Sequence, residues 1–212
     1  MSTTTDDAPA AVSAGTGIAD PAPLGLAAFA LTTFLLSVVN AHWASTSSGS
    51  AWLGYAFAYG GFAQLLAGMW EFRNRNVFGA TAFASYGGFW IGLGLWALLV
   101  APHTTGLEAS RDLGWIILAF AIFNTYMLII STQVNVAVFL VFLTLELTEI
   151  FLFIGNFTQK AAPAASPDAI IKIGGIIGVV TALVAWYTSA AGVLNGIKGR
   201  AALPVGKPLF DL

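Results

Sequence analysis

Residues 20–43 read DPAPLGLAAFALTTFLLSVVNAHW, in which an acid and two prolines precede a long apolar run. About 20 apolar residues are enough for a helix to cross the hydrocarbon core of a bilayer. Because proline is tolerated in the first turn of a helix but not in its interior, the segment predicts a rigid loop and a helix that begins near Leu24. Such a loop is either a simple helix entry and N-cap, or it turns the free N–H groups and positive dipole of the helix start toward an anion.

The composition of the whole chain is typical of integral membrane proteins. Of its 212 residues, 58% are hydrophobic and only 8% are charged, and its mean hydropathy is +0.82. These values are far from those of soluble domains. A net charge of -2 gives no electrostatic reason to expect a nucleic-acid partner, and the lack of cysteine excludes disulfides, thiol catalysis and cysteine-ligated metal.

Six apolar segments are each long enough to cross a bilayer, at 24–43, 50–70, 77–100, 113–131, 134–155 and 170–196. Each segment is a continuous apolar run, whereas the strands of a membrane β-barrel alternate apolar and polar residues, so the pattern excludes a β-barrel. The sequence therefore predicts an all-α integral membrane protein with a six-transmembrane-helix bundle over residues 20–197. Residues 1–19 are polar, small and acidic, so they are expected to form a disordered tail, and they lack the basic and apolar regions of a signal peptide. Residues 198–212 are expected to form a C-terminal tail.

The basic residues predict the orientation of this bundle. With six spans, one side of the membrane carries Arg73, Arg75, Lys198, Arg200 and Lys207. The other side carries Arg111, Lys160 and Lys172. Because cytoplasmic loops carry an excess of Lys and Arg, both termini are predicted to lie in the cytoplasm of a cell whose plasma or inner membrane holds the protein.

Glycine-rich stretches occur in several predicted helices, and in lipid such residues let helix backbones approach closely. We expect most of them to serve packing alone. The step Ser85-Tyr86-Gly87-Gly88 is different, because it combines polar and flexible residues near the middle of the third predicted helix. Irregular backbone at such depths occurs where it lines a cavity, so the sequence predicts a break near Gly87.

Two carboxylic acids, Glu146 and Glu149, lie near the middle of the predicted helix 134–155. A charge at the bilayer centre costs about 2.5 to 3.5 kcal/mol and two neighbouring anions repel each other, so at least one acid is expected to be protonated. Successive helix residues turn by about 100°, which places both acids on one broad face with Leu145. The pair is either a neutral hydrogen-bonded contact or a proton relay beside a path through the membrane.

No pattern in the sequence indicates an enzyme, a metal site or a cofactor. His42 and His103 lie in different loops without a helix-spaced partner, which favours interfacial histidines over metal ligands. Gly92 and Gly94 lack the strand-to-helix context of a nucleotide-binding loop. No serine has a base at a suggestive spacing, so we expect no catalytic residue.

Several motifs occur together and in order along the chain: DPAPLGL at 20–26, YGGFAQ at 59–64, GMWE at 68–71, NVFGATAFASYGGFW at 76–90 and Gly155-Asn156. In this combination the chain resembles the acetate uptake transporter family, to which the succinate-acetate permeases belong. The resemblance implies six-helix protomers assembled as a hexamer in membrane lipid. It also implies a path for acetate, or a related short carboxylate, within each protomer.

The resemblance further implies roles for individual residues. The family's hydrophobic constriction falls on Phe29, Tyr86 and Leu145, and a position linked to the passage of larger dicarboxylates falls on Ala185. An apolar constriction suits acetate, because it strips water and excludes larger, more hydrated ions. The remaining polar candidates for the path are Tyr59, Gln64 and Asn156.

Two features depart from the family pattern. The motif at the pore mouth is usually NPAPLGL, and here it begins with an acid and comprises Asp20, Pro21, Pro23, Leu24 and Gly25. An anion at this position weakens the field of the helix start unless it caps the helix. The acidic pair is the second departure, since relatives commonly carry uncharged residues at the positions of Glu146 and Glu149.

Three functions fit these observations. The first is a transporter or channel for acetate and similar monocarboxylates, the second is an acetate-binding membrane sensor, and the third is a structural membrane oligomer. Within the first, proton symport, permeation of the neutral acid and an anion channel fit the same residues, with or without succinate as a second substrate. Glu149 slightly favours proton coupling.

Overall fold

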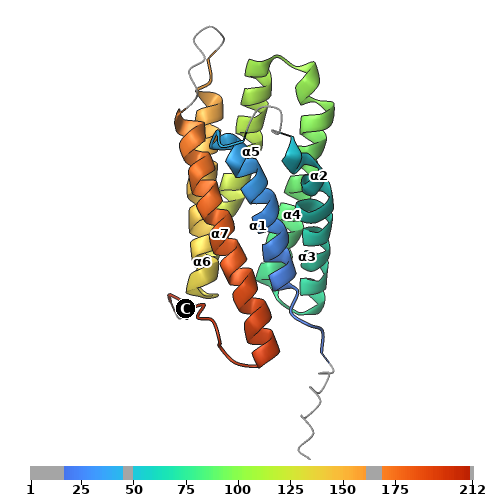
Figure 1. The fold of residues 1–212 in the computed structure, drawn as a ribbon, viewed down its shortest axis with the longest axis vertical. Coiled ribbons are helices and arrows are strands. Elements are labelled where there is room, and N and C mark those ends of the chain that lie inside the picture. Colours follow the sequence, from blue (N-terminus) through green and yellow to red (C-terminus); the bar gives the residue numbers. More distant parts are fainter. Residues whose placement is uncertain (1–16, 45–49, 161–168, 211–212) are drawn as a thin grey trace, which may run out of the picture.

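The structure is a computed structural model that describes residues 17–44, 50–160 and 169–210. Within these ranges the chain forms an elongated bundle of helices that lie side by side (Figure 1). The disordered tail predicted for residues 1–19 falls almost entirely outside the described ranges. The predicted all-helical fold is confirmed for the described part of the chain.

The helices follow the predicted apolar segments. Their bounds are α1 (Ala22–Asn40), α2 (Ala51–Phe57), the π-helical turn η2 (Ala58–Ala63), α3 (Gln64–Arg73), α4 (Val77–Leu99), the 3-10 turn η3 (Ala101–His103), α5 (Gly106–Ser131), α6 (Val136–Phe157) and α7 (Ala169–Lys198). In the described ranges, five helices are long and apolar enough to cross a membrane, by length and composition. The remaining predicted span, 50–70, corresponds to α2, η2 and α3, which follow one another without a gap.

The predicted break near Gly87 is wrong. Helix α4 runs unbroken from Val77 to Leu99, and Gly87 is buried in it. A Cβ atom at this position would lie 2.7 Å from the amide nitrogen of Leu65 in α3, so the glycine serves the close approach of two helices. The irregular backbone lies instead at η2, between α2 and α3. Gly87 therefore belongs with the glycines expected to serve packing alone, and the prediction chose the wrong helix for the irregular backbone.

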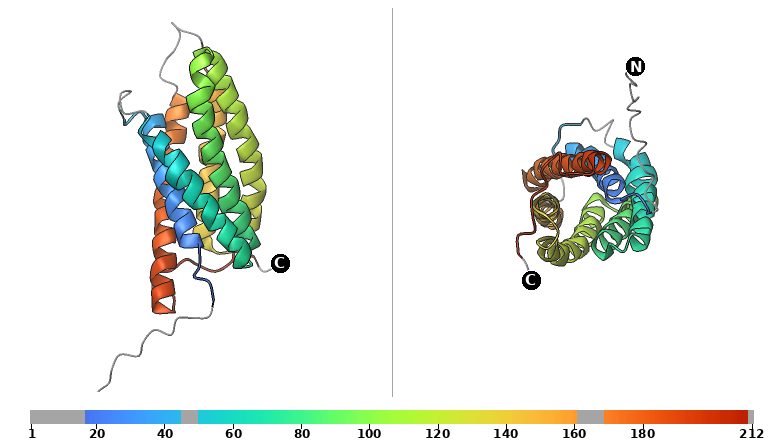
Figure 2. Two further views of the ribbon diagram at one scale, coloured as in Figure 1. Left: turned by 90° about the vertical axis from the view of Figure 1, so that its right-hand side faces the viewer. Right: turned by 90° about the horizontal axis from the view of Figure 1, so that it is seen from below.

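Close packing by small residues also joins α7 to α1, which lie against each other along much of their length. A Cβ atom on Gly175 would collide with the amide nitrogen of Ala41, and one on Gly178 would collide with the hydroxyl of Ser37. Helix α7 also packs along α6, α5 packs along α6, and α3 packs along α4. Viewed end-on, the helices surround a common axis (Figure 2).

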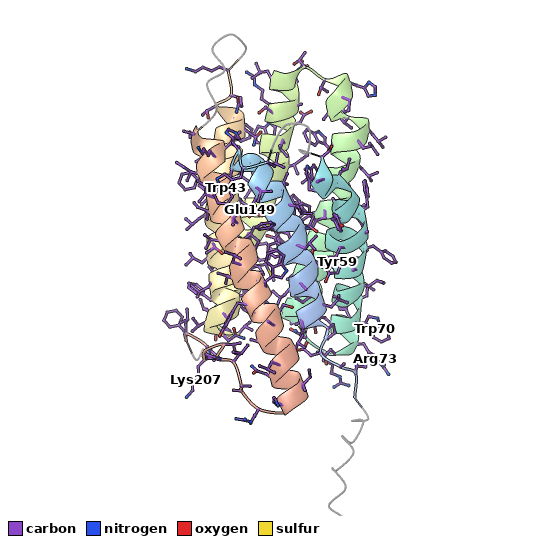
Figure 3. The ribbon with its side chains drawn as sticks, in the orientation of Figure 1. Trp43, Tyr59, Trp70, Arg73, Glu149 and Lys207 are labelled. Carbon is purple, nitrogen blue, oxygen red and sulfur yellow. The ribbon has the colours of Figure 1, made fainter. Side chains whose placement is uncertain are left out.

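Both described ends of the chain lie at the same end of the bundle (Figure 1). Arg73 and Lys207 lie at this end, and Trp43 lies near the opposite end (Figure 3). We call the first end the terminal face and the second end the distal face. The prediction that the basic residues of the loop after α3 share a side with the C-terminal tail is therefore confirmed.

Polar side chains fix where the helices begin at each face. At the terminal face, Asn76 accepts a hydrogen bond from the Gly79 amide and Asn135 accepts one from the Val138 amide, which caps α4 and α6. At the distal face, Thr105 and Glu108 form a capping box at the start of α5. The caps set the register of the helices that carry the site described below.

Residues 199–210 fold back over the terminal face, and we call them the C-terminal strap. Asn195 of α7 makes three hydrogen bonds of 2.7 to 2.9 Å to the backbone of the strap. The carbonyl oxygen of Val205 accepts a hydrogen bond of 2.9 Å from the amide of Ala137, at the start of α6. The predicted C-terminal tail is thus tied to two helices over its described length.

Candidate functional site

The three residues predicted to form a constriction come together inside the bundle. Phe29 of α1, Tyr86 of α4 and Leu145 of α6 are all buried and belong to one apolar cluster. The rings of Phe29 and Tyr86 meet edge to face, with centroids 5.7 Å apart. We call these three residues the neck. Ala185 of α7 is fully buried in the same cluster, although it lines neither of the cavities described next.

Two cavities lie on opposite sides of the neck. The distal cavity has a volume of about 110 Å³, and the neck residues form its floor while Asn40, Trp96 and Asn156 line it near the distal ends of their helices. The terminal cavity has a volume of about 300 Å³ and is lined at the terminal face by Asp20 and Asn76. Both cavities are lined by α1, α4 and α6, but by different turns of these helices.

Helical spacing explains how the neck separates them. Helices α1, α4 and α6 all run from the terminal face to the distal face, so a residue three positions before a neck residue lies about 4.5 Å closer to the terminal face. The residues at these positions form a second apolar layer, which lines the terminal cavity and consists of Leu26, Phe83 and Phe142. Two stacked apolar layers therefore stand between the cavities.

The hydroxyl of Tyr86 connects the neck to a buried polar network. Its oxygen lies 3.1 Å from Oδ1 of Asn124 in α5 and 3.3 Å from Oε1 of Glu149 in α6. The side-chain amide of Asn124 donates to Oε2 of Glu146 at 2.7 Å and to the carbonyl of Phe142 at 3.0 Å. A single asparagine thus links Tyr86 to one acid, while Tyr86 itself contacts the other.

The two acids occupy different environments. Glu149 is buried, lines the distal cavity, and has a carboxyl oxygen, Oε2, without a hydrogen-bond partner among the described residues. Glu146 is only half-buried, and both of its oxygens are held by α5, through Asn124 at 2.7 Å and the Thr125 hydroxyl at 2.8 Å. The expectation of one shared face is too coarse, because neighbouring helices separate the acids into one at the cavity and one beside α5.

Asn124 is the central residue that sequence reasoning missed. It is completely buried and bonds to two other side chains, Tyr86 and Glu146, and to one backbone carbonyl within reach of the neck. Its signal in the sequence is weak but present: Asn124-Thr125 is the only strongly polar pair inside the apolar run 115–130. A polar side chain at such depth marks an interhelical hydrogen bond or a functional site.

The mouth motif forms the entry of α1, which begins at Ala22, two residues before the predicted start near Leu24. Asp20 accepts a hydrogen bond of 3.0 Å from the Ala22 amide, so its own carboxylate satisfies part of the helix start. The carbonyl of Pro23 accepts a hydrogen bond of 2.6 Å from Ser189 of α7, which fixes the entry of α1. Asp20 and Pro23 line the terminal cavity, whereas Leu24 is exposed on the outside of the bundle.

The other polar candidates separate into two groups. Asn156 lines the distal cavity and accepts a hydrogen bond of 3.0 Å from Ser110 of α5. Tyr59, in η2, and Gln64, at the start of α3, line neither the distal nor the terminal cavity. The motifs in the sequence therefore did not distinguish residues that line the cavities from residues in η2 and α3 that do not.

Comparison with known proteins identifies consistent relatives. Residues 4–206 match the model of the GPR1/FUN34/yaaH family. Acetate permease A of Emericella nidulans is 39% identical over 196 residues, which cover 88% of this chain and 65% of that protein. The succinate-acetate/proton symporter SatP of Escherichia coli K12 is 35% identical over 194 residues, which cover 91% of this chain and 97% of that protein.

The fold has a solved relative as well. A structure described as that of the bacterial acetate channel SatP superposes with a TM-score of 0.80 at 33% sequence identity, and the match covers 90% of this chain and 100% of that one. Among the fungal relatives, the chain spans 65% of the length of acetate permease A and 61% of the length of accumulation of dyads protein 2 of Saccharomyces cerevisiae.

Proposed function

The chain belongs to the GPR1/FUN34/yaaH family, and from this premise we propose that it carries acetate and related short monocarboxylates across a membrane. Its multi-pass helical fold and its relatives agree with this role. The path runs within one protomer, from the distal cavity through the neck to the terminal cavity.

The observation that carries this proposal is the pair of cavities on opposite sides of two apolar layers. A hydrated ion loses its water at a narrow apolar constriction, whereas a small acid with a methyl group loses much less. Phe29, Tyr86 and Leu145 form the constriction, and the Tyr86 hydroxyl is a polar group at its edge. Ala185, buried behind the neck without a bulky side chain, sets how far the constriction can widen and thereby limits the passage of succinate.

We further propose that transport is coupled to protons through Glu149 and Glu146. The Tyr86 hydroxyl has one proton and two acceptor neighbours, Asn124 Oδ1 and Glu149 Oε1. When that proton points to Asn124, a proton on Glu149 is needed to complete the second hydrogen bond. Uptake of an acid from the distal cavity and proton exchange at Glu149 therefore involve the same group of residues.

Assembly and orientation complete the proposal. The protomers form a hexamer in the plasma or inner membrane, supported by the large apolar side chains exposed along the helices, which need lipid or a neighbouring protomer to cover them. Both termini lie in the cytoplasm, supported by the basic residues at the terminal face. Residues 20–197 form the transport unit, with cytoplasmic segments before and after it.

Uptake of labelled acetate into liposomes that hold the purified protein, recorded together with internal pH, tests the function. We expect flux above empty vesicles with acidification of the lumen in excess of that due to free diffusion of acetic acid. Glu149→Gln keeps the shape of the side chain but cannot exchange a proton, so it should abolish the excess acidification. Asp112→Asn, at an exposed position on α5, is the matched control. Wild-type flux no greater than that of empty vesicles contradicts the proposed transport.

A further inference from the structure

Buried polar atoms without a partner gather around the distal cavity. Four of the side chains that line it carry such an atom, namely Thr33 Oγ1, Trp90 Nε1, Trp96 Nε1 and Glu149 Oε2. In the described part of the chain only two more such atoms occur, on Gln64 and Glu71, and neither residue lines this cavity. Buried polar groups are almost always hydrogen-bonded, so a cluster of unpaired ones indicates a place that is paired by something other than the protein.

Three of these residues form a ring one helical turn from the neck. Thr33, Trp90 and Glu149 each lie four positions after a neck residue, on α1, α4 and α6 respectively. The i to i+4 spacing keeps them on the same faces as the neck and places them about 6 Å closer to the distal face. Their exposed fractions are 6%, 3% and 6%, so all three are more than nine-tenths buried. We call this set the polar ring.

The polar ring has the donors and acceptors that a carboxyl group requires. The indole of Trp90 can only donate, and the Thr33 hydroxyl can donate or accept, which suits the two acceptor oxygens of a carboxylate. Glu149 adds a carboxyl group, and two neighbouring carboxyl groups bind tightly when they share one proton. The rest of the wall is mixed, because Leu36 and Leu93 are apolar whereas Asn40, Trp96 and Asn156 add polar atoms toward the distal end of the cavity.

We propose that the polar ring is a docking site for the carboxyl group of a short monocarboxylic acid, held by Trp90, Thr33 and Glu149 immediately distal to the neck. This inference rests on the proposed transport function and names the place where the substrate pauses before crossing. One proton lies between Glu149 and the bound acid.

Size and neighbouring charge agree with this assignment. The cavity volume of about 110 Å³ exceeds the roughly 10–15 Å³ that a single water needs, so a small acid has room. The ionisable groups that interact with Glu149 are Glu146 on its own helix and Tyr86 on α4. Neither is a cation, so the site binds a carboxylate only when a proton accompanies it.

The test uses the full-length protein in lipid nanodiscs, labelled with 5-fluorotryptophan and titrated with acetate while its fluorine NMR spectrum is recorded. The chain has seven tryptophans, and Trp90→Phe assigns the signal of interest by its disappearance. We expect the Trp90 signal to shift saturably with acetate. Trp90→Phe and Thr33→Val should each weaken acetate binding about tenfold, since each loses one hydrogen bond to a charged group.

Trp43→Phe is the matched control, because Trp43 is exposed at the distal end of the bundle and lies outside the cavity. It should leave the affinity for acetate unchanged. Should a variant fail to fold, the saturable shift of the Trp90 signal in the wild-type protein still decides the matter. A Trp90 signal that stays fixed while the same preparation takes up acetate into liposomes overturns the docking site and leaves the transport function standing. Absence of uptake with a responsive Trp90 signal overturns transport alone.

Discussion

Replacing Tyr86 with phenylalanine removes one hydroxyl and leaves the neck almost unchanged. The ring keeps its size and its edge-to-face contact with Phe29, at a centroid distance of 5.7 Å. The lost group contacts Asn124 Oδ1 at 3.1 Å and Glu149 Oε1 at 3.3 Å. The substitution therefore separates the polar function of Tyr86 from its role as part of an apolar constriction.

The size of the effect follows from these two contacts. Hydrogen bonds of buried side chains contribute about 0.6 to 1.5 kcal/mol each in proteins and in membrane interiors, so the pair is worth roughly 1 to 3 kcal/mol. If the hydroxyl supports proton exchange at Glu149 while the acid enters the neck, this loss slows coupled flux about five- to 150-fold. Passage of a neutral solute of similar size through the neck should change little.

The assay is acetate uptake with simultaneous internal pH in proteoliposomes, with glycerol uptake as the neutral reference. Tyr55→Phe provides the control, since Tyr55 is exposed on α2 and removal of its hydroxyl should change neither flux. Tyr86→Ala should instead widen the neck and admit larger carboxylates. Acetate flux and acidification that remain at wild-type values in Tyr86→Phe would refute the assignment of the hydroxyl to proton exchange.

Two further predictions concern the scaffold. Gly175→Ala places a methyl group against the Ala41 amide, and the resulting overpacking of α7 on α1 should lower the free energy of unfolding by about 1 to 3 kcal/mol. The measurement is the unfolding temperature in detergent, which should fall. Gly88→Ala has open space around it and should leave this temperature unchanged or raise it. Equal unfolding temperatures in the two variants would contradict the close approach of α7 to α1. Asn195→Ala removes three hydrogen bonds to the C-terminal strap, each worth about 0.5 to 1.5 kcal/mol, and should speed amide exchange at Ala202 and Leu203. Exchange in α6 should stay unchanged beyond the Ala137 amide, which itself bonds to the strap. Unaltered exchange in the strap would show that other contacts hold it.

The sequence predicted the helices because they follow from local patterns, since continuous apolar runs fix them. The neck residues Phe29, Tyr86 and Leu145 came instead from the resemblance to a family, and the structure buries all three in one cluster. The break near Gly87 was mispredicted because glycine has the same local pattern whether it breaks a helix or lets a neighbour approach. Only the position of Leu65, on another helix, distinguishes the two.

The polar part of the site was less predictable for a related reason. Helix α5 is apolar around most of its circumference, so its sequence does not indicate which way Asn124 points. The different surroundings of Glu146 and Glu149 depend on Thr125 and Tyr86, which lie on other helices. Contacts between elements distant in sequence decide these features, and periodicity within one helix contains no information about them.

The C-terminal strap has a consequence for biogenesis. Val205, near the end of the chain, lines the terminal cavity and bonds to the start of α6. Chains emerge from the ribosome with their N-terminal parts first, so the helices can insert and assemble before this residue has been released. The wall of the terminal cavity is therefore completed later than the helices that form the rest of it, once the C-terminal strap has left the ribosome and folded back over the terminal face.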